Sequence, residues 1–126
     1  MDGRLALEGY DPVAFFSETG AARGSVKRTA VIGGITYRFA SEANRDRFLA
    51  EPARFEPKFG GWSVAGMGRG EKSAPDASQF LIRDGQLLLF SDAEERGAFL
   101  KQGSEALLAA AQSAWIEILE GSPEKP

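Results

Sequence analysis

Residues 37–70 read YRFASEANRDRFLAEPARFEPKFGGWSVAGMGRG, and we expect the rest of the chain to be organised around this stretch. It contains six of the aromatic residues in a chain that has nine Phe, two Tyr and two Trp. The pattern predicts a strand end, a short charged helix, a proline-punctuated turn and a glycine-bracketed aromatic with almost no spacer between them. Because a passive connection needs far less, residues 59–62, Phe-Gly-Gly-Trp, are the first place to look for a site.

Two hairpins are predicted. The first spans residues 29–39 and turns at Gly33-Gly34, since two glycines supply the positive φ angles of a two-residue turn. Its register predicts an apolar face made of Ala30, Ile32, Ile35, Tyr37 and Phe39. The second hairpin, residues 79–90, turns at Asp84-Gly85. Both of its faces are apolar, which predicts central strands covered on each side.

Short helices are expected between the strands. Asp11-Pro12 predicts the start of a two-turn helix through Phe16, with Asp11 as its N-cap. Ser41 is the predicted N-cap of a helix through about Ala50, which would contact the core through Phe48 and Leu49. Pro52 either stops this helix or opens a second turn.

The last third of the chain is predicted to be helical. Ser91 and Glu94 form a capping-box pattern for a helix that reaches Leu100, and the apolar spacing predicts a second helix over residues 105–119. Together these elements predict an α+β fold: a small antiparallel sheet of about four strands from two hairpins, flanked by short helices and a C-terminal helical pair. We expect a single domain, residues 1–126, with a frayed tail at residues 119–126.

Composition limits the partners. The net charge of −3 and the pI near 5.0 give no broad basic surface, which argues against nucleic acid as a partner. The sequence has no apolar run long enough to span a bilayer, and its start, MDGRLALEGYD, lacks a signal-peptide pattern. We therefore expect a soluble protein, and leave its compartment open, because a periplasmic or exported protein whose signal has been removed fits equally well.

The chain has no cysteine and no histidine. Thiol nucleophiles, thiolate or imidazole metal sites and Ser-His-Asp triads are thereby excluded within this chain. Any chemistry must use carboxylates, Lys, Arg, Tyr, Ser or a bound cofactor.

With these residues laid out, the chain resembles the YHS domain family, whose small domains occur alone or fused to metal-handling proteins. The resemblance covers nearly the whole chain and is fairly specific in the order and spacing of its motifs. The motifs are residues 9–16 (GYDPVAFF), residues 37–41 (YRFAS), residues 44–46 (NRD), Phe48, Pro52, Phe55, Pro57, residues 59–62 (FGGW), residues 84–87 (DGQL) and Trp115.

The resemblance implies an association with metals, copper especially, and a cysteine directly after the Gly-Gly-aromatic motif. Ser63 occupies that position here, and the histidine of the family name is absent. Met67 is the one soft ligand nearby, and a single thioether is too weak to hold copper. We expect the family's fold with a degenerate metal site and predict no cofactor. Copper binding through ligands other than Cys and His is kept as an alternative.

Seven side chains are candidates for a ligand pocket: Tyr10, Asp11, Tyr37, Phe59, Trp62, Ser63 and Met67. Structural roles compete with this hypothesis, because Tyr10-Asp11 also fits an anchored N-cap and Tyr37 fits a core position. The glycines before Trp62 either let a ligand approach or let helix and sheet pack tightly. Whether Trp62-Ser63 begins a strand or a helix is left open.

Two further patterns have simple structural explanations. Residues 66–73, GMGRGEKS, superficially suggest a phosphate loop, but no glycine immediately precedes Lys72, so a flexible surface loop is predicted. The acidic pairs Glu94-Glu95 and Glu117-Glu120 are predicted to be solvated helix faces.

The leading hypothesis is a non-enzymatic binding domain for a small ligand or a partner segment. An alternative is a protein-interaction or oligomerisation module, a homodimer included, that uses the terminal helix around Trp115 or the exposed side of the first hairpin. An enzyme would require a carboxylate, Tyr or Lys with a shifted pKa in a pocket, and Tyr10 and Asp11 are its candidates.

Overall fold

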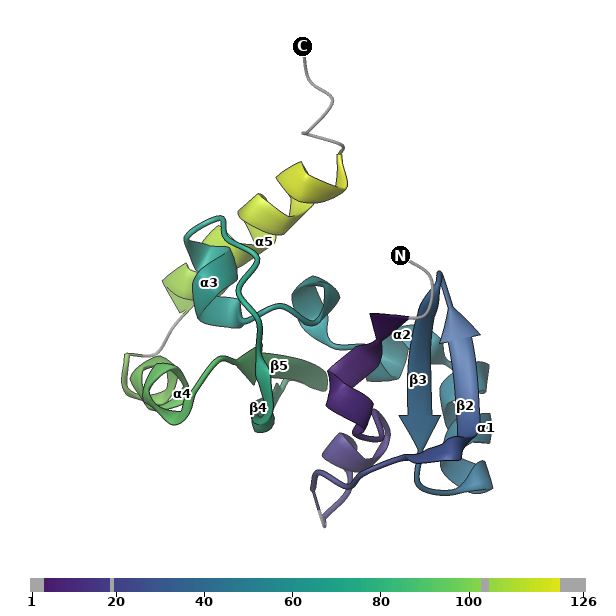
Figure 1. Cartoon of the computed structure of the whole chain (residues 1–126). Helices are drawn as coiled ribbons and strands as arrows, with labels where there is room; N and C mark the ends of the chain where they lie inside the picture. Colours follow the sequence, from purple (N-terminus) through teal and green to yellow (C-terminus); the bar gives the residue numbers. More distant parts are fainter. Residues whose placement is uncertain (1–3, 19, 103–104, 121–126) are drawn as a thin grey trace. The chain divides into compact units, whose positions relative to one another are not determined.

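The computed structural model describes residues 4–18, 20–102 and 105–120 (Figure 1). The chain divides into two compact units, one formed by Met1–Pro57 with Ile82–Leu87 and the other by Lys58–Leu81 with Leu88–Pro126. Each unit has its own hydrophobic core, in which aromatic side chains are prominent. In the described part of the chain, no helix has both the length and the apolar character needed to cross a membrane.

The first unit is built on a three-stranded sheet with the order β1-β3-β2. Its strands are β1 (Arg4–Leu5), β2 (Ser25–Ile32) and β3 (Ile35–Phe39). β2 and β3 are antiparallel, and Ile32 lies opposite Ile35 and Ala30 opposite Tyr37, which confirms the predicted register. β1 pairs in parallel with the second edge of β3.

Short helices complete the first unit: the 3-10 helices η1 (Ala6–Gly9) and η2 (Ala14–Phe16), then α1 (Glu42–Ala50) and α2 (Pro52–Phe55). Ser41 caps α1 as predicted, because its Oγ accepts a hydrogen bond of 3.1 Å from the backbone N–H of Asn44. Figure 1 shows α1 beside β2 and β3, which it contacts. Pro52 opens a second helix.

Two predictions for these helices are wrong. Leu49 does not contact the core, since it is 41% exposed, and Phe48 alone of the predicted pair is buried. The predicted two-turn helix after Asp11 is the three-residue η2. The chain leaves helical geometry at Ser17, whose φ of −92° and ψ of 168° are extended.

The core of the first unit joins the sheet to its helices through aromatic contacts. The ring centroid of Phe48 lies 4.6 Å from that of Tyr37 and 5.3 Å from that of Phe39. Full burial of one such side chain is worth about 1.5–3 kcal/mol. The buried members of this core are Val13, Ala30, Tyr37, Phe39, Phe48 and Phe55.

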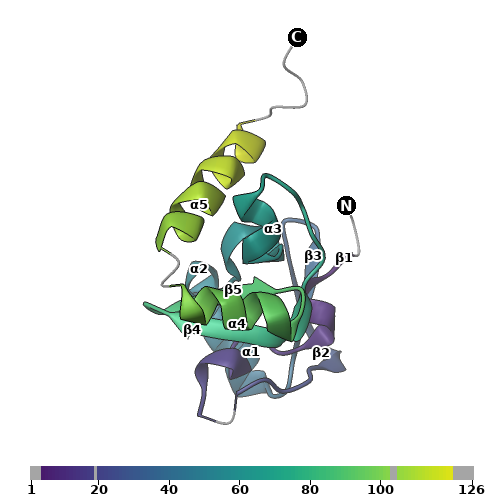
Figure 2. The same ribbon diagram turned by 90° about the vertical axis from the view of Figure 1, so that its left-hand side faces the viewer.

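The second unit contains most of the remaining elements. They are η3 (Lys58–Gly61), α3 (Val64–Gly68), β4 (Asp76–Arg83), β5 (Gln86–Phe90), α4 (Ala93–Lys101) and α5 (Glu105–Leu119). Figure 2 shows α4 along the β4–β5 hairpin and α5 beside α3, which it contacts. The tip of the hairpin, Ile82–Leu87, belongs to the first unit.

The α+β class, the two hairpins and the C-terminal helical pair are confirmed. The strands form two hydrogen-bonded sheets rather than one, because β1 takes the second edge of β3 while β4 and β5 pair with each other. β5 is buried on both faces as predicted, but the pair does not consist of central strands, and Ile82 of β4 is 39% exposed.

Three predictions about local structure in the second unit are revised. Asp92, not Ser91, caps α4, and its Oδ1 accepts a hydrogen bond of 2.8 Å from the N–H of Glu95. Residues 66–68 are the end of helix α3, with Gly66 and Met67 buried, so a surface loop is wrong for them. Of the predicted tail, residue 119 ends α5, and residues 121–126 lie outside the described part.

Candidate functional site

The seven predicted site residues are divided between the two units. Tyr10, Asp11 and Tyr37 belong to the first unit, and Phe59, Trp62, Ser63 and Met67 belong to the second. Each group therefore has its own surroundings and its own role.

Asp11 is fully buried, and both of its carboxylate oxygens accept hydrogen bonds. Oδ1 accepts from the N–H groups of Val13 at 2.8 Å and Ala14 at 3.3 Å. Oδ2 accepts at 2.8 Å both from the N–H of Ala40 and from Nδ2 of Asn44. A carboxylate with four donors is well satisfied in the interior. The N-cap of η2 is Val13 rather than the predicted Asp11. Asp11 instead accepts hydrogen bonds from the backbone at the start of η2 and joins this helix to the end of β3 and to α1.

The two tyrosines of the first unit pack differently. Tyr10 is partly buried, with the guanidinium carbon of Arg23 4.8 Å from its ring centroid and the ring of Phe15 at 6.1 Å. Such a cation–π contact is worth about 0.5–1 kcal/mol at an exposed site. Tyr37 is buried against Phe48, as its place on the apolar face of β3 predicts.

The glycines after Phe59 allow a helix to approach closely. Phe59, Gly60 and Gly61 all have positive φ values, 57°, 64° and 89°. A Cβ atom on Gly60 would lie 2.6 Å from Cη2 of Trp115, which belongs to α5. Of the two explanations left open by the sequence, tight packing is therefore the one seen at Gly60.

Ser63 links α3 to α4. It is the N-cap of α3, where its Oγ accepts a hydrogen bond of 3.2 Å from the N–H of Gly66, so a helix and not a strand begins here. The same hydroxyl donates to Oε1 of Glu95 at 3.0 Å, and this oxygen also accepts from the N–H of Ser91 at 2.9 Å. Ser63 is fully buried. Glu95 is half-buried and held in place, so the prediction of a solvated face is wrong for it.

A metal centre does not fit the residues around Ser63. The hydroxyl of Ser63 is already used in two hydrogen bonds, and Met67 is fully buried in the core that contains Phe90 and Phe99. Across the described ranges, no group of three or more Asp, Glu, His or Cys side chains is placed to hold a metal ion.

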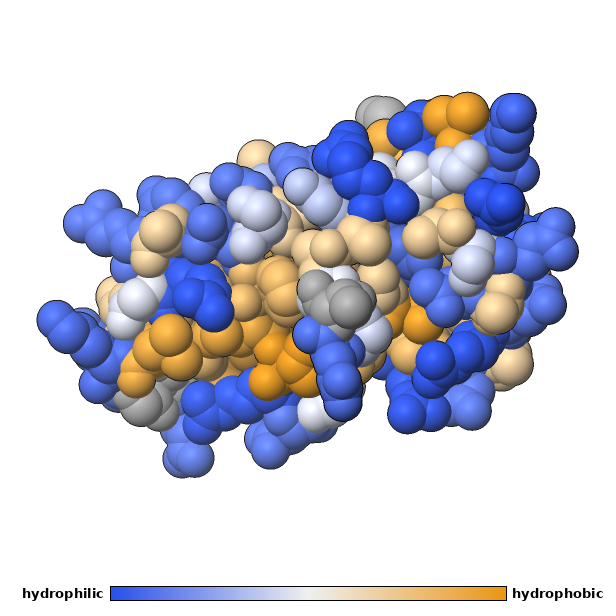
Figure 3. All heavy atoms as spheres, turned by 90° about the horizontal axis from the view of Figure 1, so that it is seen from below, coloured by the Kyte–Doolittle hydropathy of each residue, from blue (hydrophilic) through white to orange (hydrophobic). Residues whose placement is uncertain are grey.

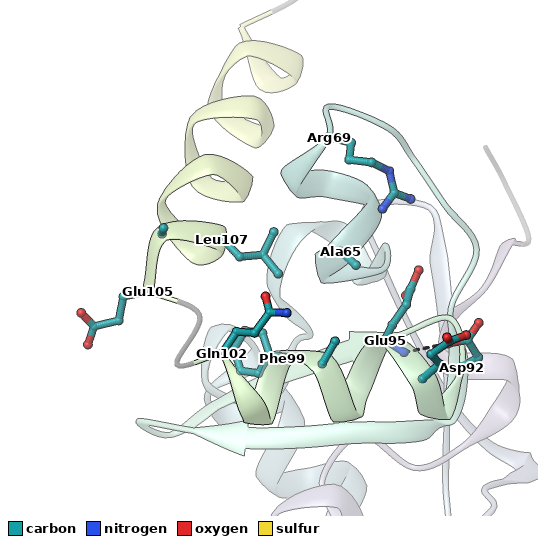
Figure 4. Close-up of a pocket in the computed structure, with 11 residues that line it drawn as sticks. Ala65, Arg69, Asp92, Glu95, Phe99, Gln102, Glu105 and Leu107 are labelled. Atoms are coloured by element: carbon teal, nitrogen blue, oxygen red, sulfur yellow. Dashed lines mark hydrogen bonds between the residues drawn. The ribbon is translucent and has the colours of Figure 1, made fainter.

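A pocket of about 640 Å³ lies in the second unit, between α3, α4 and the start of α5 (Figure 4). One part of its lining is apolar or small, formed by Ala65, Ala98, Phe99, Ala106 and Leu107. The polar part consists of Arg69, Asp92, Glu94, Glu95, Gln102 and Glu105. Gly68 lets α3 and α5 pack closely, since a Cβ atom at this position of α3 would overlap Cδ1 of Leu107.

The carboxylates at one end of the pocket have fixed positions. Asp92 is held by its capping bond to the N–H of Glu95, and Glu95 is held by Ser63 and Ser91. In Figure 4 the dashed line joins Asp92 to the N–H of Glu95, the side chain of Glu95 extends toward α3, and that of Glu105 points away from the pocket. Arg69 is already paired, because its Nε lies 3.2 Å from Oε1 of Glu71.

Comparisons with protein-family models, curated proteins and solved structures found no match for this chain. The site is therefore assessed from its own residues.

None of the seven predicted residues lines the pocket. Sequence reasoning missed Glu95 because it placed the helix cap one residue too early, at Ser91 with Glu94. The signal was present one position later, since Asp92 is followed by an acidic residue three positions on. Ser63 does not line the pocket, but its hydroxyl donates a hydrogen bond to Glu95, which does.

Proposed function

We propose that this chain is a non-enzymatic, YHS-like binding domain that holds a small organic molecule between α3, α4 and α5. The observation that carries the proposal is the pocket, whose volume of about 640 Å³ is in the range of small-molecule sites. Its lining combines an apolar part with a few fixed polar groups, which is typical of such sites.

The residues favour an organic ligand over a metal. Copper and zinc sites use thiolate, imidazole or several carboxylates, and the chain has neither of the first two. Where a thiolate is expected from the family resemblance, the hydroxyl of Ser63 is committed to Gly66 and Glu95. At the position where the resemblance implies a metal ligand, Ser63 instead holds Glu95 of the pocket lining.

A binding role is also favoured over catalysis. A general acid or base is usually recognised by a perturbed pKa in a cleft. The hydroxyl and backbone N–H of Ser78 donate to Asp76 and hold the pKa of that carboxyl below its ordinary value, but Asp76 is exposed on β4 and does not line the pocket. Asp11 is committed to four structural hydrogen bonds.

Filling the pocket tests this function. Ala98 lines the pocket and is exposed, so the variant Ala98→Phe places a ring in the cavity without entering the core. Ala110→Phe is the matched control, because Ala110 is exposed on α5 and does not line the pocket. We expect ligand-observed NMR with a panel of aromatic alcohols, carboxylic acids and amines to detect binders of the wild-type chain. Affinity should fall at least about tenfold in Ala98→Phe, because the ring occupies the ligand's volume.

The control should bind as the wild type does. If no member of the panel bound, or if Ala98→Phe bound as tightly as Ala110→Phe, the pocket would not be the site. Thermal unfolding of both variants shows whether they remain folded, and both substitutions carry a similar helix-propensity cost of about 0.5 kcal/mol.

A protein-interaction module is the second candidate, and the exposed face of β2 favours it. Val26 and Val31 are 68% and 64% exposed on this edge strand. Exposed apolar side chains are not confined to β2, and the face of the molecule in Figure 3 carries hydrophobic residues among hydrophilic ones. Lys27, Arg28 and a register shift between Ser25 and Thr29 are features that protect a sheet edge from pairing. Light scattering separates the candidates, since a strictly monomeric chain argues against a homodimer.

A further inference from the structure

We infer that the ligand of this pocket is an amphipathic organic cation, an apolar group carrying an amine with N–H donors. The inference rests on the proposed function and adds the chemical class of the ligand. It is drawn from the charge of the lining, the acceptor capacity of two carboxylates and the scarcity of aromatic rings among the described lining residues.

The lining carries a clear excess of negative charge. Among the described lining residues, three acidic side chains, Asp92, Glu94 and Glu95, stand against one basic side chain, Arg69, and a fourth acidic residue, Glu105, points its carboxylate away from the cavity. The charge of Arg69 is offset by Glu71, to which its Nε is bonded. Several negative charges near a partly desolvated cavity attract a cation and disfavour an anion.

The N-terminus of α4 does not reverse this preference. A helix N-terminus contributes roughly half a positive charge. Asp92 and Glu95, which lie at that terminus, contribute two negative charges. The field at this end of the pocket is therefore negative, and an anionic ligand would face both carboxylates.

The carboxylates have acceptor capacity left. Asp92 uses Oδ1 for its capping bond, and Glu95 uses Oε1 for Ser63 and Ser91. Among the described residues, no hydrogen bond reaches Oδ2 of Asp92 or Oε2 of Glu95. An ammonium group has N–H donors that can bond to either carboxylate, and such charge-assisted hydrogen bonds are the stronger kind.

The apolar part of the pocket determines which chemical group the ligand carries besides its amine. Phe99, Ala65 and Leu107 offer a surface for a hydrocarbon or aromatic group. Phe99 is the one aromatic residue in the lining, whereas quaternary ammonium groups are recognised by cages of several rings. The pocket therefore fits an amine that donates hydrogen bonds better than a fully methylated one.

Isothermal titration calorimetry on the full chain tests the class with three matched probes. They are 2-phenylethylamine, the neutral 2-phenylethanol and the trimethylated ammonium analogue of the amine. We expect the amine to bind about tenfold more tightly than either of the others, since only the amine can form hydrogen bonds with the carboxylates from a charged donor. Raising the ionic strength should weaken amine binding more than alcohol binding.

The variant Glu95→Gln tests the residue. An amide oxygen can still accept from Ser63 and Ser91, so both hydrogen bonds are kept while one negative charge is lost. We expect about tenfold weaker binding of the amine and little change for the alcohol. Glu117→Gln is the control, because Glu117 is exposed on α5 and does not line the pocket.

The results separate the ligand class from the proposed function. Equal affinity for amine and alcohol, or equal amine affinity in Glu95→Gln and Glu117→Gln, would overturn the cation while leaving a ligand pocket. Tighter binding of the trimethylated probe would overturn the requirement for N–H donors. If none of the three probes bound, the inference would fail, and the panel experiment with Ala98→Phe decides separately whether the pocket binds other molecules.

Discussion

The variant Asp11→Ala should lower the free energy of unfolding by about 3–5 kcal/mol, as expected when one partner of a buried charged network is removed. Three backbone N–H groups and the side-chain amide of Asn44 would lose their acceptor in the interior. Because these donors lie on η2, at the end of β3 and on α1, their loss would loosen three elements at once. Urea unfolding followed by circular dichroism measures the effect.

Two further variants make this prediction specific. Asp11→Asn keeps the shape and one acceptor oxygen but turns an amide toward the donors, so we expect an intermediate loss of about 1–3 kcal/mol. Asp46→Ala removes a carboxylate from the exposed face of α1 and should change stability by no more than about 0.5 kcal/mol. If Asp11→Ala were as mild as Asp46→Ala, the buried network would not stabilise the fold as described.

The variant Gly60→Ala should cost about 2–4 kcal/mol, combining left-handed backbone strain with overpacking. Gly60 has a φ of 64°, and its new Cβ atom would meet Trp115 at 2.6 Å. The contact would push α5 away from η3. Trp62 and Trp115 both belong to the second unit, so tryptophan fluorescence during urea unfolding reports on the affected unit.

Gly33→Ala separates the two costs. Gly33 has nearly the same φ, 59°, but nothing lies within 4 Å of the position of its Cβ atom. It should therefore show only the backbone strain, about 1–2 kcal/mol. Equal losses for Gly60→Ala and Gly33→Ala would mean that the glycine does not serve the packing of Trp115.

The elements that the sequence predicted best are those fixed by local chemistry. The turn at Gly33-Gly34 sets the register of β2 and β3, because a two-residue turn leaves one pairing and the apolar face selects the same one. The cap at Ser41 follows from its hydroxyl and the N–H of Asn44. Asp11 was predicted as the N-cap of a two-turn helix, whereas Val13 holds that position in the short η2. The bonds of Asp11 to Ala40 and Asn44 come from tertiary structure that no local pattern encodes.

The pocket could not be predicted in the same way. Its lining comes from three segments, around Ala65, Glu95 and Leu107, that only the packing of helices brings together. The sequence analysis drew attention to Ser63 through a resemblance that implies a cysteine at this position. Its hydroxyl fixes Glu95, so the position expected to carry a thiolate instead orients a carboxylate of the pocket.

We propose that the pocket between α3, α4 and α5 binds a small organic molecule. The most direct test of this proposal is a series of ¹H–¹⁵N correlation spectra of the full chain titrated with 2-phenylethylamine. We predict saturable shifts at amides that border the pocket, such as those of Ala65, Glu95 and Leu107. Shifts confined to the first unit, for example around Tyr10, or no saturable shift at all, would contradict it.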